Sequence, residues 1–127
     1  MKFSEKEIEI AQKLKELGFE WTPAPGDYVY DIEGLIEKKS PFQERVYFIL
    51  DIKHFLRRAG SVEGITKAMC YLPLWEDCRV ILKSLSVPWQ KIYEKLIEKN
   101  AFINEIERSV LYEIILKELT NQVKGNK

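Results

Sequence analysis

Apolar residues recur at helical spacing near both ends of the chain, and this spacing is lost between residues 21 and 51. Near the N-terminus, Ser4 and Glu7 form a capping box and Phe3 stands where a hydrophobic staple would begin. A helix is therefore predicted from Glu5, and Gly18 is placed to end it in the left-handed conformation. Its apolar stripe consists of Ile8, Ala11, Leu14 and Leu17. We expect a surface helix with one buried face.

The segment from residue 21 to residue 51 has the composition of turns and short strands. Pro23, Pro25 and Pro41 punctuate it, and residues 27–30 and 34–37 are short runs rich in β-forming residues. A nearly continuous apolar run follows at residues 45–50, which is typical of a strand covered on both faces. The simplest assembly is a small antiparallel meander of about three strands within residues 26–50.

The remaining chain is predicted to be helical. Asp51 is a good N-cap for a helix over residues 52–59, which Gly60 would end, and Ser61 is the next N-cap. Pro73 and Pro88 each open a segment with one apolar face. The apolar positions of the last and longest helix, which is expected to follow a break at Asn100, are Ile103, Ile106, Val110, Ile114, Ile115 and Leu119. The fold class is therefore α+β and mainly helical, with residues 1–127 as a single domain.

Composition and charge restrict the classes of function. The chain is 46% hydrophobic and 31% charged, as in a globular protein. Its 20 basic and 20 acidic residues give a net charge of zero, so no global positive field would attract nucleic acid or anionic lipid. No apolar run reaches the length of a membrane span, and the N-terminus alternates charge where a signal peptide needs an apolar core. We expect a cytoplasmic protein that does not enter a membrane.

The cysteines and acids do not match a metal or redox motif. Cys70 and Cys78 are read as two buried thiols, with a disulfide between them as the alternative. The acids around the predicted meander are better explained as turn and cap residues than as cation ligands; they are Asp27, Asp31, Glu33 and Asp51. Neither a metal site nor a cofactor is expected.

A polar site around His54, the single histidine, is one alternative for function. Asp51 lies one turn before His54, and Arg57 and Arg58 follow it, so a carboxylate and a guanidinium could support acid and base chemistry there. No candidate nucleophile or glycine-rich phosphate loop accompanies the histidine. This alternative describes a small enzyme or ligand-binding protein, and no catalytic residue is assigned.

The aromatic residues favour a different function. Strand residues alternate between faces, so some aromatics of the predicted meander must point away from the core. If Trp21, Tyr28 and Tyr30 share an exposed face, they form a surface suited to a protein partner or to self-association, since Tyr and Trp are enriched in binding hot spots. The leading prediction is a protein-interaction module without enzymatic activity, which uses this surface or the last helix.

A nucleic-acid-binding role for residues 73–99 is a second alternative. Two helices of suitable length would be joined by residues 86–88, and the second carries Gln90, Lys91 and Lys95. The zero net charge and the acidic Glu94 and Glu98 on the same segment argue against it.

Two segments resemble small uncharacterised proteins of Gram-positive bacteria and their phages. The first is WTPAPGDYVYDIEGLIEKK, with a Trp, a Pro and a Gly-Asp before a hairpin, and the second is YLPLWEDCRVIL, with an aromatic-Leu-Pro sequence opening a helix. The chain departs from this pattern at Tyr71, where a Trp is expected. The resemblance implies no activity, ligand or catalytic residue.

Overall fold

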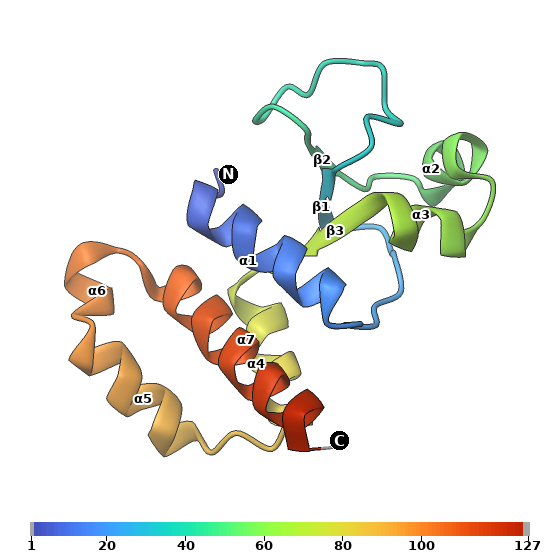
Figure 1. Cartoon of the computed structure of the whole chain (residues 1–127). Coiled ribbons are helices and arrows are strands. Elements are labelled where there is room, and N and C mark those ends of the chain that lie inside the picture. The colour runs from blue at the N-terminus through green and yellow to red at the C-terminus, as the bar shows by residue number, and fades with distance from the viewer. Residues whose placement is uncertain (1, 126–127) are drawn as a thin grey trace. The chain divides into compact units, whose positions relative to one another are not determined.

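The computed structural model describes residues 2–125 and shows a mainly helical α+β protein with a three-stranded antiparallel sheet (Figure 1). In chain order the elements are α1 (Glu5–Glu16), β1 (Tyr28–Asp31), β2 (Val46–Phe48), α2 (Ile52–Ala59), α3 (Val62–Ala68), β3 (Met69–Leu72), α4 (Trp75–Ser84), α5 (Trp89–Glu98), α6 (Ala101–Asn104) and α7 (Glu107–Gly125). The predicted fold class is confirmed. The chain divides into two compact units, Met1–Leu72 and Pro73–Lys127, and its organisation as one domain stays a prediction.

The sheet has the order β2-β1-β3, with β1 in the centre. Tyr28 is paired with Phe48 on β2 and with Leu72 on β3, and both pairings are antiparallel. The strand predicted at residues 27–30 is present as β1, one residue later, and the strand predicted at residues 45–50 is present in shorter form as β2. The predicted strand at residues 34–37 is wrong, because the third strand is β3, so the sheet is not a meander confined to residues 26–50.

Asp31 explains why residues 34–37 do not form a strand. Its buried carboxylate accepts hydrogen bonds from the backbone N–H groups of Leu35, at 3.0 Å, and Ile36, at 2.8 Å. These donors are satisfied by a side chain, so they are not offered to a neighbouring strand. Gly34, with a φ of +71°, supplies the left-handed turn, and Ile36 is buried in the core.

One core cluster of the unit that contains the sheet lies on the Val29 face of β1, and Val46, Cys70 and Leu72 are buried on the opposite face. In this cluster, Val29 is buried with Ile49 from the segment after β2, Ile65 from α3 and Met69 from β3. α1 packs against β3, and its capping box between Ser4 and Glu7 is present as predicted. The caps at Asp51, Gly60 and Ser61 are also confirmed, as is the left-handed Gly18.

In the second unit, α4, α5 and α6 all pack against α7 (Figure 1). Buried apolar residues from all four helices form its core, and the hydroxyl of the buried Tyr112 donates a hydrogen bond to the carbonyl of Pro73 at 2.6 Å. The core residues are Cys78, Leu82, Ile92, Leu96, Ala101, Val110, Leu111, Tyr112 and Ile115. α4 begins two residues after Pro73, and Pro88 is the N-cap of α5, so both prolines lie at helix starts as predicted.

The predicted last helix is interrupted near its start. Asn100 is left-handed, as the predicted break requires, but Glu105 is left-handed too, with a φ of +55°, and it separates α6 from α7. The N–H of Ile106 bonds the carbonyl of Ala101 at 2.9 Å, which is the reversal that ends a helix in a Schellman motif. The apolar stripe expected through Ile103 is therefore wrong at that residue, which is 82% exposed.

Candidate interaction surfaces

The structure does not bring Trp21, Tyr28 and Tyr30 onto one face. Trp21 stacks on Tyr71, with ring centres 5.1 Å apart and planes 8° from parallel. Tyr71 is the β3 partner of Val29, so its ring lies on the Val29 face of the sheet, whereas Tyr28 and Tyr30 lie on the opposite face. All three predicted residues are half-buried.

Tyr28 is surrounded by other aromatic rings of its own unit. Its ring centre lies 5.0 Å from Phe48, 5.7 Å from Phe3 and 6.0 Å from Phe42, in tilted and edge-on arrangements that aromatic pairs prefer. These contacts cover the face of β1 opposite Val29, where Val46, Cys70 and Leu72 are also buried. Trp21 and Tyr28 therefore have aromatic partners within the fold.

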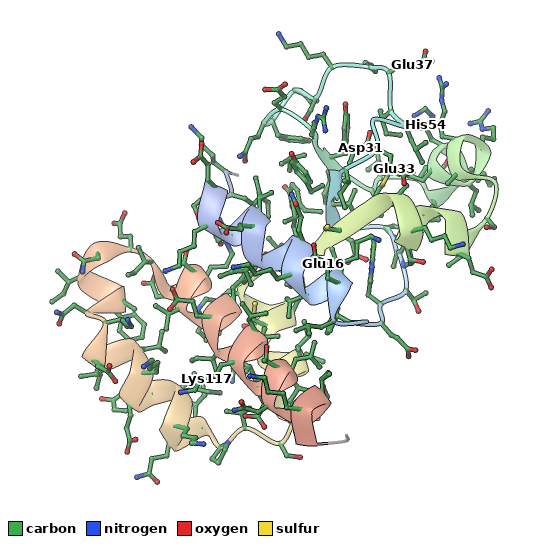
Figure 2. The ribbon with its side chains drawn as sticks, in the orientation of Figure 1. Glu16, Asp31, Glu33, Glu37, His54 and Lys117 are labelled. Carbon is green, nitrogen blue, oxygen red and sulfur yellow. The ribbon has the colours of Figure 1, made fainter. Side chains whose placement is uncertain are left out.

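Asp51, His54, Arg57 and Arg58 all lie exposed on α2 or at its N-terminus, and Figure 2 labels His54. The Asp51 carboxylate accepts the N–H of Lys53 at 3.0 Å as an N-cap, and Arg58 lies 3.8 Å from Glu37 across an exposed ion pair. The His54 ring packs edge-on against Phe55. Within residues 2–125, no group of three His, Cys, Asp or Glu side chains is placed to hold a metal ion.

Both cysteines are buried thiols. Burial raises the pKa of Cys70 from its ordinary value of 9.0 to about 11, because the charged thiolate would lose its hydration. The nearby Lys15 opposes this rise in pKa, and Glu16 adds to it.

Exposed apolar residues gather in the second unit. Of the ten large apolar side chains that are exposed within residues 2–125, seven belong to α4, to α5 or to residues 102–106. Three of these, Trp89, Tyr93 and Ile97, are spaced four residues apart on α5 and are each about half exposed. Residues at this spacing share one side of a helix, so these three form an apolar flank of α5.

A groove of about 470 Å³ lies between α4 and α5, and we call it the α4–α5 groove. Leu82, Ile92 and Leu111 are its buried lining residues. Its more exposed lining residues are Glu76, Arg79, Val80, Lys83, Val87 and Trp89.

Arg79 is held between two aromatic rings at this groove. Its guanidinium carbon lies 5.2 Å from the ring centre of Trp75 and 5.7 Å from that of Trp89, and a guanidinium nitrogen lies 3.5 Å from Glu76. Cation–π contacts of this kind fix the orientation of an otherwise flexible side chain. The Arg79 side chain therefore contacts both tryptophan rings in the absence of a partner.

A second groove, of about 310 Å³, lies along the other flank of α5 and is bounded by α7; we call it the α5–α7 groove. Four lysines line it, three from or just beyond α5 and one, Lys117, from α7. Figure 2 shows Lys117 on the side of α7 that faces α5. The complete lining is Val87, Lys91, Lys95, Lys99, Glu113, Ile114, Lys117, Glu118 and Asn121.

Neither groove was identified from the sequence, although a signal was present. The apolar residues of α5 cover an arc wider than a single buried stripe, because Trp89, Tyr93 and Ile97 extend the face made by Ile92 and Leu96. α5 packs against α6 and α7, and these two neighbours leave Trp89, Tyr93 and Ile97 about half exposed. On α5, the predicted buried apolar face therefore consists of Ile92 and Leu96.

None of the helices in residues 2–125 is long and apolar enough to cross a membrane. Comparison of the chain with protein-family models, with curated proteins and with solved structures finds no match in any of the three. The function proposed below is therefore argued from the residues of the chain itself.

Proposed function

We propose that this protein is a protein-interaction module whose α4–α5 groove receives an amphipathic helix of a partner protein. The observation that carries the proposal is the pairing of an apolar groove with the Trp89 and Arg79 side chains at its edge. Trp and Arg are the residue types most enriched in binding hot spots, and a groove between two helices is the site that an amphipathic helix fills. The cytoplasmic location expected from the sequence belongs to this proposal.

The chemistry of the groove suits an apolar segment with an acidic edge. Its lining charges are Glu76, Arg79 and Lys83, so two cations stand against one anion. Val80 and Trp89 expose apolar surface that a partner would remove from water, at about 25 cal/mol for each Å². The partner is thus expected to place apolar residues over Val80 and Trp89 and a carboxylate near Lys83.

The exposure of the His54 group favours binding over catalysis. Asp51 already caps α2, and His54, Arg57 and Arg58 are open to solvent, where water weakens their effect on a substrate. The α4–α5 groove has the better geometry for recognition, since Val80 and Trp89 expose apolar surface along it.

A photo-crosslinking amino acid at position 80, which is exposed beside the groove, tests this proposal. We expect it to capture one protein from a lysate of the native host, whereas the same amino acid at Lys53, exposed on α2, does not. The captured protein is then purified, and its affinity is measured by calorimetry. Trp89→Ala is expected to weaken binding by roughly 30-fold, a loss of about 2 kcal/mol that is typical of a hot-spot Trp.

Circular dichroism of Trp89→Ala should retain the helix content of the original protein, because Trp89 is half exposed at the first position of α5. Equal capture from positions 80 and 53, or an unchanged affinity for Trp89→Ala, would reject the α4–α5 groove as the binding site.

A further inference from the structure

We propose that the α5–α7 groove is a second binding site, which takes an acidic helical segment of a partner protein. Lys91, Lys95 and Lys99 would pair with carboxylates spaced four residues apart on that segment. This inference stands on different residues from the α4–α5 groove, apart from Val87, which lines both.

The first support is the spacing of the lysines. Residues 91, 95 and 99 are four apart, so they follow one side of α5, and the helix backbone rises about 6 Å from each of these residues to the next. An acidic residue at every fourth position of a partner helix repeats with the same rise. Lys117 on α7 faces this row from the opposite wall.

The second support is the local charge. Four lysines and two glutamates line the groove, which leaves two positive charges in excess in a chain whose total is zero. Lys95 forms an exposed ion pair with Glu98 at 3.4 Å. Among the described residues, Lys91, Lys99 and Lys117 have no ion pair with the chain itself, so their charges are open to a partner.

The acids near the groove favour a protein over a nucleic acid. Glu113 and Glu118 line the groove, and Glu94 is exposed on α5. A phosphate backbone carries negative charge at every step and would meet these carboxylates, whereas a protein segment can place neutral or basic residues opposite them. Val87 and Ile114 add apolar surface that a Leu or Ile of the segment would cover.

A second copy of the chain does not supply such a segment. α1 has acids four residues apart at Glu5 and Glu9, but the next position in that series is Lys13, which pairs with Glu9 at 3.5 Å. α5 has Glu94 and Glu98, and the next position is Phe102. No helix in residues 2–125 has three acids at this spacing, so the partner is a different protein.

Fluorescence anisotropy with a labelled synthetic helix tests the site on the full chain. The probe repeats Glu-Ala-Ala-Leu, which places Glu and Leu on adjacent stripes, and the comparison probes have Gln or Lys in place of every Glu. We expect the Glu probe to bind with a Kd on the order of tens of micromolar, since each exposed ion pair contributes little. Its affinity should fall at least tenfold between low and high salt as the charges are screened.

The double variant Lys91→Glu with Lys95→Glu should weaken the Glu probe at least tenfold and should strengthen binding of the Lys probe. The matched control is Lys53→Glu with Lys67→Glu, which makes the same change in net charge at exposed positions of α2 and α3. The control should change the affinity less than threefold. If the reversed variant loses helix content, Lys91→Gln with Lys95→Gln replaces it, with a loss of at least threefold expected.

Three results would overturn the proposal. One is equal affinity for the Glu, Gln and Lys probes, and another is equal loss in the groove variant and its control. The third is displacement of the Glu probe by a single-stranded oligonucleotide that binds more tightly, because the groove would then be a nucleic-acid site. Trp89→Ala should leave the Glu probe unaffected, so a failure of this groove is distinct from a failure of the α4–α5 groove.

Discussion

At the scale of single residues, the buried polar groups of this protein serve the fold. Asp31 is 1% exposed, and each of its carboxylate oxygens accepts a backbone N–H, so its burial is compensated by hydrogen bonds. The sequence indicated that the acids of this segment are turn residues, and the structure confirms that role for Asp31. The loop at residues 34–37 could not be predicted. Its apolar residues suit a strand as well as a buried loop, and only the structure shows that the Asp31 carboxylate takes the N–H groups of Leu35 and Ile36.

Cys70 should be the least reactive kind of thiol, since burial raises its pKa to about 11. At pH 8, a rise of this size reduces the thiolate fraction about 100-fold relative to an ordinary cysteine, and steric protection adds to that. In a Cys78→Ser variant, iodoacetamide should therefore alkylate Cys70 at least 100-fold more slowly in buffer than in concentrated urea. Mass spectrometry over time gives both rates, and similar rates would contradict the burial of Cys70.

The same shift predicts how stability depends on pH. The folded state holds the Cys70 proton up to a higher pH than the unfolded state, so the unfolded chain is the first to lose its proton as pH rises above 9. The protonated Cys70 thiol contributes fully to the free energy of unfolding below pH 9, and this contribution is lost progressively between pH 9 and pH 11. The free energy of unfolding, measured with urea, should fall more steeply between pH 9 and pH 11 for the original chain than for Cys70→Ala.

At the scale of elements, local signals predicted the helix ends well and the pairing of strands poorly. Ser4, Asp51 and Ser61 cap helices as their side chains indicate, because capping depends on residues within one turn. β3 was missed because four residues directly after a helix have no period of their own, and their strand character comes from hydrogen bonds to β1, about 40 residues earlier. The break at Glu105 was missed because a left-handed Glu leaves no signal in the sequence.

Gly64 shows how a packing requirement can look like a weak helix position. A Cβ at residue 64 would lie 2.2 Å from the carbonyl oxygen of Ala59, so the end of α2 and the start of α3 approach each other only with glycine there. Gly64→Ala should lower the free energy of unfolding by about 2 to 3 kcal/mol, as overpacking does. Gly125→Ala, with open space around the added Cβ, is the control and should change it by less than about 1 kcal/mol.

Chemical denaturation of both variants gives these differences. A Gly64→Ala protein as stable as the original would mean that the junction of α2 and α3 can open without cost, and the close approach at Ala59 would then not constrain the fold.

At the scale of the whole molecule, the proposed interaction surfaces consist of residues that are spread over several helices. We predicted an aromatic binding surface at Trp21, Tyr28 and Tyr30, but Trp21 and Tyr28 pack against other rings within the fold and Tyr30 is half-buried. Exposure depends on which helix faces meet, and α5 packs on α7 in a way that leaves one flank apolar and the other basic. The sequence shows the wide apolar arc of α5, but it does not show which part of that arc the neighbouring helices cover.

Exposed apolar residues on a chain of zero net charge predict self-association near the isoelectric pH of about 6.6. Dynamic light scattering should show the largest mean particle size near this pH and a smaller size at pH 9.

Ile103→Lys and Leu50→Lys add the same charge at residues that are 82% and 80% exposed, but Ile103 lies among the exposed apolar residues of the second unit and Leu50 has Asp51 beside it. Ile103→Lys removes a member of an exposed apolar group as well as adding a charge. It is therefore expected to reduce self-association more than Leu50→Lys does. Equal effects of the two variants would assign the association to net charge alone.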